Sequence, residues 1–126
     1  MFLRGLFLTT GVFVIGVGFV LLVAPQSYFQ LYATAYAPGM DFPARRFSPA
    51  VLALGAVLIA ARDLAPGRFL RALCLITALA FLGVAGTGLS AWWSGIARLH
   101  ILGAVALELV IAVLFLLAAW WRKRRF

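Results

Sequence analysis

Long apolar segments alternate with short basic stretches along this chain. A helix needs about 20 residues to cross the hydrocarbon core of a bilayer, and segments of that length fit into the sequence four times. We expect transmembrane helices at approximately residues 5–24, 48–64, 69–93 and 98–121. The pattern therefore predicts an all-α fold, an integral membrane four-helix bundle in which residues 1–126 form a single transmembrane domain.

The first segment has to be distinguished from a cleaved signal peptide, because Arg4 gives it a basic start. Its apolar core, Leu6 to Ala24, exceeds the roughly 7 to 15 residues of such a signal. Pro25 also stands directly after the plausible cleavage position. We therefore expect a retained helix.

The second segment is shorter, with fifteen uncharged residues between Arg46 and Arg62. Ser48 and Pro49 are typical of a helix start, since a serine oxygen can cap free N–H groups and proline suits the first helical position. The uncharged part would span roughly 22 Å. We expect Arg62 either to extend toward a headgroup or to lie partly inside the protein.

The loop between the first two segments is too long for a tight turn and holds all three tyrosines, Tyr28, Tyr32 and Tyr36. Their four-residue spacing places them on one stripe of a helix. We expect a short amphipathic helix at residues 26–37, lying on the outer membrane face with its tyrosines at headgroup depth. The alternative is a lid or docking surface over the bundle.

Composition agrees with a membrane protein, because 66% of the residues are hydrophobic and 11% are charged, against roughly 25% charged in soluble domains. Basic residues dominate the net charge of +8. Three of them fall on the outer side (Arg45, Arg46 and Arg98) and eight on the side of the termini (Arg4, Arg62, Arg68, Arg71 and residues 122–125). The positive-inside rule then puts both termini in the cytoplasm, and we expect a multi-pass protein of a bacterial inner membrane.

The basic tail, Arg122, Lys123, Arg124 and Arg125, is expected to contact anionic lipid headgroups. Clustered basic side chains can also neutralise nucleic-acid phosphates. Here the charges are scattered along helix ends, so we expect membrane lipids as partners and no nucleic acid.

Glu108 is a carboxylic acid near the middle of the fourth segment. At that depth an acidic side chain costs about 2.5 to 3.5 kcal/mol and usually faces protein. His100, Ala104 and Ala112 complete a stripe of small and polar side chains around it, and the opposite side is more lipid-like (Leu102, Val105, Leu109, Val113 and Leu116). We expect Glu108 to point at protein.

The partner of Glu108 is open at this point. Arg62 could reach inward, and Thr87 lies at comparable depth if the helices are antiparallel. Three roles remain: a pin between two helices, a proton-binding or cation-binding site, or a contact with another subunit or ligand.

Residues that could hold a cofactor or metal are scarce. His100 is the single histidine and is expected to be interfacial, since a bis-histidine haem would need a second one. Cys74 is expected to serve as a small hydrophobe. Without paired carboxylates, a phosphate loop or zinc spacing, the sequence predicts no catalytic residues, no cofactor, no metal and no enzyme activity.

Small residues at four-residue spacing indicate faces where membrane helices could approach closely. The pairs are Gly83 with Thr87, Gly86 with Ser90, and Ala56 with Ala60. We expect them to pack the bundle tightly.

The stretch "DFPARRFSPAVLALGAVLIAARDL", Asp41 to Leu64, resembles the loop and second helix of the small bacterial four-helix membrane proteins grouped around DoxX. In those, an arginine-rich entry precedes a helix rich in glycine and alanine that ends in another arginine. The resemblance implies the same four-helix fold. The small multidrug-resistance exporters have a similar length, but their functional glutamate is in the first helix, which here is uncharged.

These observations predict a non-enzymatic accessory or structural subunit that packs against a larger membrane complex or against itself. The alternative is a small oligomeric transporter or channel with Glu108 as its titratable site and the tyrosine loop as a gate. A third possibility is a membrane enzyme that binds a quinone or lipid near Tyr32, Tyr36 and His100.

Overall fold

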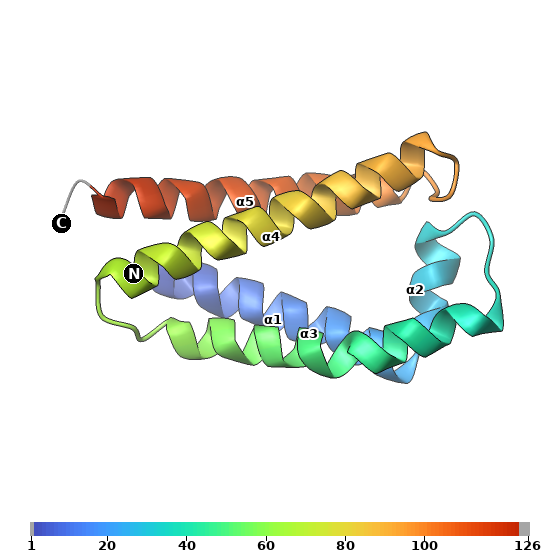
Figure 1. Ribbon diagram of the computed structural model, residues 1–126, viewed down its shortest axis with the longest axis horizontal. Coiled ribbons are helices and arrows are strands. Elements are labelled where there is room, and N and C mark those ends of the chain that lie inside the picture. Colours follow the sequence, from blue (N-terminus) through green and yellow to red (C-terminus); the bar gives the residue numbers. More distant parts are fainter. Residues whose placement is uncertain (1, 124–126) are drawn as a thin grey trace.

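The computed structural model describes the backbone of residues 2–123 and the side chains of residues 2–120. Four long helices, each apolar enough to cross a membrane, make up most of it, which confirms the all-α four-helix fold and a multi-pass membrane protein. In chain order the elements are α1 (Phe2–Val23), α2 (Pro25–Tyr32), the short 3-10 helix η1 (Pro38–Met40), α3 (Asp41–Ala61), α4 (Arg68–Trp93) and α5 (Ile101–Lys123) (Figure 1).

The bundle consists of two antiparallel helix pairs. α1 packs along α3, and α4 packs along α5, with fewer contacts between the pairs (Figure 1). The start of α1, the end of α5 and the α3–α4 loop lie together at one end, which we call the terminal end. The other end, with α2 and the α4–α5 loop, is called the loop end.

Glycine brings the backbones of α1 and α3 together. A Cβ atom placed on Gly11 would lie 2.6 Å from Ile59 Cγ1 and 2.8 Å from the carbonyl oxygen of Gly55. The reverse also holds, because a Cβ on Gly55 would lie 2.5 Å from Ile15 Cγ1. Gly18 extends the contact toward the loop end, where its Cβ would meet Leu52 at 3.1 Å. The absence of side chains at these positions therefore sets the spacing of this pair.

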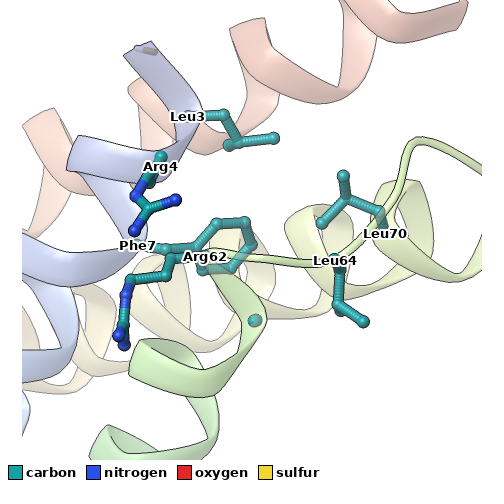
Figure 2. Close-up of a pocket in the computed structure, with 7 residues that line it drawn as sticks. Leu3, Arg4, Phe7, Arg62, Leu64 and Leu70 are labelled. Carbon is teal, nitrogen blue, oxygen red and sulfur yellow. The ribbon is translucent and has the colours of Figure 1, made fainter.

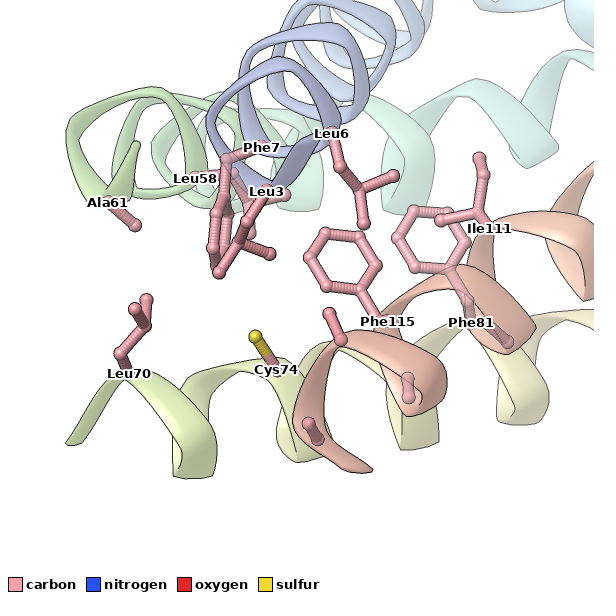
Figure 3. Packing of buried hydrophobic residues seen from close by; sticks show 14 of the residues in the cluster. Leu3, Leu6, Phe7, Leu58, Ala61, Leu70, Cys74, Phe81, Ile111 and Phe115 are labelled. Carbon is pink, nitrogen blue, oxygen red and sulfur yellow. The ribbon is translucent and has the colours of Figure 1, made fainter. Parts of the chain in front are cut away.

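The hydrophobic core lies toward the terminal end, where both pairs contribute to it (Figure 3). At its centre the rings of Phe7 and Phe115, both fully buried, meet edge to face with centroids 5.2 Å apart. α1 and α3 contribute Leu3, Leu6, Val14, Leu58 and Ala61, and α4 and α5 contribute Leu70, Cys74, Ala78, Phe81, Ile111, Ala112, Ala118 and Ala119. Large apolar side chains thus join the two pairs at this end.

At the loop end the two pairs are joined by hydrogen bonds between loops. Ala33 and Ala97 form an isolated antiparallel bridge. The N–H of Thr34 donates to the carbonyl oxygen of Ile96 at 2.9 Å, and Nε of Arg98 donates to the carbonyl oxygen of Ala33 at 2.9 Å. The two helix pairs are therefore joined by apolar side-chain packing at the terminal end and by hydrogen bonds between loops at the loop end.

α3 begins at Asp41, so the expected helix start at Ser48 was wrong. Pro49 lies inside the helix and has no N–H to give to the carbonyl oxygen of Arg45, four residues earlier. The hydroxyl of Ser48 donates to that oxygen at 2.8 Å instead. This replacement lets the helix continue through the proline.

The small-residue pairs expected to pack the bundle do not do so within this chain. Gly83, Gly86, Thr87 and Ser90 on α4 are exposed, as are Ala56 and Ala60 on α3. α4 instead packs on α5 through Gly88, where a Cβ would lie 3.0 Å from Val105 Cγ2. Val105, expected on the lipid-like side, is accordingly buried.

Candidate functional site

Glu108 lies on α5 in the half of the bundle nearer the loop end, before the buried residues of the shared core begin at Ile111. Its side chain is half-buried. Among the residues that the structure describes, Glu108 makes no hydrogen bond or ion pair to any other. The carboxyl group therefore faces protein in part, as its position in the sequence predicted, but without a fixed polar partner.

The two candidate partners of Glu108 form their contacts elsewhere. Arg62 follows α3 at the terminal end, where Nη1 donates to the carbonyl oxygen of Ile59 at 2.8 Å and Nε lies 3.7 Å from Asp63 Oδ2. Thr87 is exposed and donates its hydroxyl proton within α4, to the carbonyl oxygen of Val84 at 2.8 Å. Neither of these two candidates therefore pairs with Glu108 in the structure.

Tyr28 of α2 is the ionisable neighbour of Glu108. Burial raises the pKa of the Tyr28 phenol, and the nearby charge of Glu108 and the phenol of Tyr32 raise that pKa further. The rings of Tyr28 and Tyr32 meet edge to face with centroids 4.9 Å apart. Tyr28 is thus the residue through which the two-tyrosine contact of α2 comes within electrostatic reach of Glu108.

Tyr32 attaches α2 to the second helix pair. Its ring packs against the buried cluster of Ala85, Ile101 and Val105, which joins the outer halves of α4 and α5. α2 therefore contacts α4 and α5 through Tyr32, in addition to its contacts with α1 and α3. α2, which was expected to lie on the membrane surface, thus also packs against the bundle through Tyr32.

Tyr36 does not continue the tyrosine stripe, because α2 ends at Tyr32 and not at residue 37. Its ring stacks on Phe29 with centroids 6.0 Å apart. The Tyr36 hydroxyl donates to Asp41 Oδ2 at 2.7 Å, and this hydrogen bond is the main cause that raises the pKa of the Tyr36 phenol. Tyr36 thereby ties the loop to the start of α3.

The remaining candidate residues are separate from Glu108. His100 is exposed and stands directly before α5. Arg122 and Lys123 close the backbone of α5, but their side chains, and all of Arg124 and Arg125, lie outside the described part of the chain. The expected lipid contact of this tail stays a prediction.

A feature that the sequence analysis missed lies at the terminal end. Nη1 of Arg4 is 2.7 Å from Asp63 Oδ1, which joins the first turn of α1 to the α3–α4 loop. Both side chains are more than half exposed, so the pair contributes little to stability. The two residues are 59 positions apart and carry no shared motif, so only the fold brings them together.

Comparison of the chain with protein-family models, with curated proteins and with solved structures finds no match. The resemblance to the DoxX-like proteins therefore stays an expectation from one stretch of sequence.

Proposed function

We propose that this chain is a non-enzymatic membrane subunit, structural or accessory, that packs against copies of itself or against a larger membrane complex. The observation that carries the proposal is one face of α4. Gly83, Gly86, Thr87 and Ser90 recur at the spacing of a single helical stripe, and all four are exposed. A Cβ placed on either glycine would meet nothing within 4 Å.

Such a stripe matters in a membrane because lipid tails are as apolar as the side chains of a helix. Helices associate there through close packing and hydrogen bonds, and small residues favour both because they let the backbones approach closely. This chain already uses the device internally, since Gly11 and Gly55 allow α1 and α3 to touch. The stripe on α4 has the same chemistry and is vacant within the chain.

Other exposed positions differ from this face. Gly16 on α1 is also open, with nothing within 4 Å of a Cβ. Its neighbours on the same face are bulky and exposed: Val12, Phe13, Phe19 and Val20. That face suits contact with lipid tails.

The test compares Gly83→Leu/Gly86→Leu with Gly16→Leu as the matched control. Leucine is a better helix former than glycine, so neither change weakens the helix itself. Native mass spectrometry of protein extracted gently from its own membranes should find the wild type and Gly16→Leu in assemblies. The α4 double variant should be largely monomeric. A monomeric wild type, or unchanged assembly of the double variant, would refute the proposal.

A second candidate function rests on a separate observation, the half-buried Glu108 beside Tyr28 with no ion pair among the described residues. In a transporter or channel this carboxyl would bind a proton or cation within the membrane. Glu108→Gln should then abolish proton or potassium flux into liposomes while leaving assembly intact. Equal flux with both proteins would exclude this function.

We also propose a bacterial inner membrane with both termini in the cytoplasm. Arg4, Arg62, Arg68 and Arg71 belong to the terminal end, whereas Arg45, Arg46 and Arg98 belong to the loop end. The excess of positive charge at the terminal end supports this orientation. A reporter enzyme that works only in the cytoplasm should be active when it is fused to either terminus. A reporter that works only outside the cytoplasm should be inactive in the same fusions.

A further inference from the structure

The terminal end contains a pocket of about 130 Å³ where α1, the end of α3 and the start of α4 meet (Figure 2). Two of its lining residues are arginines, Arg4 and Arg62, and the others are Leu3, Phe7, Ala61, Leu64 and Leu70. Figure 2 shows both guanidinium groups on one side of the Phe7 ring and Leu64 and Leu70 on the other. The pocket is therefore cationic on one wall and apolar on the opposite wall.

The cationic wall is incompletely neutralised. Asp63 is the one carboxylate that pairs with Arg4 and Arg62 in the described part of the chain, at 2.7 Å and 3.7 Å. Two guanidinium groups thus share one negative charge, which leaves a net charge of +1. Arg68 and Arg71, in the first turn of α4, add further positive charge at the same end.

The start of α4 adds to this field. Gly67 at its N-cap has no side chain with which to cap the first turn, and the N-terminus of a helix carries a partial positive charge. Leu70, from that first turn, lines the pocket. Nε of Arg71, one residue further, is buried without a hydrogen-bond partner among the described residues. The start of α4 therefore adds positive charge at this end, together with one buried donor on the residue next to Leu70.

We propose that this pocket binds the phosphate group of an anionic phospholipid. The planar guanidinium groups of Arg4 and Arg62 suit phosphate oxygens, which they can contact through two parallel N–H donors. The wall formed by Leu64 and Leu70 accommodates the glycerol and upper acyl part. The pocket lies at the ends of membrane-spanning helices, where headgroups are found. This site is independent of the assembly surface on α4.

The experiment measures lipid binding to the full chain by native mass spectrometry, with phosphatidylglycerol titrated against phosphatidylcholine. Arg4→Gln/Arg62→Gln should weaken phosphatidylglycerol binding about tenfold, since charge-assisted hydrogen bonds are lost. The matched control is Arg45→Gln/Arg46→Gln, which removes the same charge from exposed residues of α3 and should leave binding unchanged. Equal losses in both variants would show nonspecific attraction and overturn the proposal.

A second variant guards against simple misfolding. Asp63→Asn breaks the same ion pairs as the arginine double variant but frees both guanidinium groups for a ligand. The site therefore predicts tighter phosphatidylglycerol binding in Asp63→Asn, whereas a purely structural role for these residues predicts weaker binding. Weaker binding would overturn the proposal.

Inorganic phosphate distinguishes the two sources of this chemistry. A lipid site should keep phosphatidylglycerol when millimolar phosphate is added, because the apolar wall contributes to binding. The contrary result is that phosphate displaces phosphatidylglycerol and that the arginine double variant also loses phosphate binding. The pocket would then be a phosphate site, and its assignment to a lipid would be overturned.

Discussion

Gly11 and Gly55 face each other across the α1–α3 pair so closely that each glycine's missing side chain is replaced by the other's backbone. A Cβ on Gly11 would lie 2.8 Å from the carbonyl oxygen of Gly55, and a Cβ on Gly55 would lie 2.9 Å from the carbonyl oxygen of Gly11. Because the obstacle is backbone, no side-chain rotation can relieve it. The two helices would have to separate.

Gly11→Ala should therefore destabilise the protein by about 1 to 3 kcal/mol, as overpacking does. Gly16→Ala is the matched control, because its Cβ meets nothing within 4 Å and alanine is the better helix former by about 0.5 to 1 kcal/mol. Thermal unfolding in detergent compares the two variants. Equal melting temperatures would contradict the close crossing.

Ser48 is predicted to matter because of Pro49. Ser48→Ala leaves the carbonyl oxygen of Arg45 without its 2.8 Å hydrogen bond, at a cost of about 1 kcal/mol. Pro49→Ala restores an N–H that can reach the same oxygen. The cost of Ser48→Ala should therefore shrink in the Pro49→Ala background. If Ser48→Ala costs the same free energy of unfolding with and without Pro49, the Ser48 hydroxyl does not stand in for the missing N–H of Pro49.

Cys74 offers a natural probe of the shared core, since it is the single cysteine and is buried. Phe115→Ala should open the packing around the Phe7 ring and speed alkylation of Cys74 by a membrane-permeant maleimide. Phe69→Ala removes an aromatic ring that is 70% exposed and should leave the rate unchanged. Similar rates in both variants would show that the pairs are not joined through these rings.

The loop-end connection predicts local protection from hydrogen exchange. The amide of Thr34 donates to Ile96, and the Thr34 hydroxyl donates to the carbonyl oxygens of Gly95 and Ile96 at 3.0 and 2.9 Å. Thr34→Ala should therefore speed exchange in residues 32–34 and 95–98, measured by mass spectrometry. Ser94→Ala is the control, because the Ser94 hydroxyl bonds only within its own turn, to Ser90. Unchanged protection in Thr34→Ala would refute the role of this contact.

The Tyr28–Glu108 relationship predicts a shifted tyrosine titration. The pKa of Tyr28 is raised above its ordinary value of 10.0 by burial and then by Glu108. The neutral phenol is thus favoured in the folded protein, so its contribution to stability is present below pH 10.0 and is lost as the pH rises through the raised pKa.

Absorbance at the tyrosinate band follows this titration directly. Glu108→Gln should lower the pKa of Tyr28, because it removes a neighbouring negative charge. Asp41→Asn should instead lower the pKa of Tyr36, whose hydroxyl donates to Asp41, and leave Tyr28 unchanged. If the pKa of Tyr28 is the same in Glu108→Gln as in the wild type, the charge of Glu108 does not act on Tyr28.

Hydropathy alone predicted the four spans, because lipid exposure requires apolar runs of a fixed length regardless of how helices pack. The bounds of α4 were close to expectation, whereas α3 began earlier because a serine hydroxyl can stand in for the N–H that proline lacks. Whether a serine hydroxyl can take this role depends on local backbone geometry, and the helix propensities of the residues do not reveal it. The same limit applies to α2, whose end at Tyr32 separates Tyr36 from the other two tyrosines.

The sequence by itself determined that the chain has four segments apolar enough to cross a membrane, and that Glu108 stands in one of them with part of its surface against protein. Tertiary structure alone decided which small residues pack, since glycine is equally apolar at Gly11, which is buried in a crossing, and at Gly83, which is open. It also decided that Tyr28, and neither Arg62 nor Thr87, neighbours Glu108. The physical reason is that helix pairing and rotation depend on side-chain shape across distant segments, whereas membrane insertion depends on the summed hydropathy of one segment.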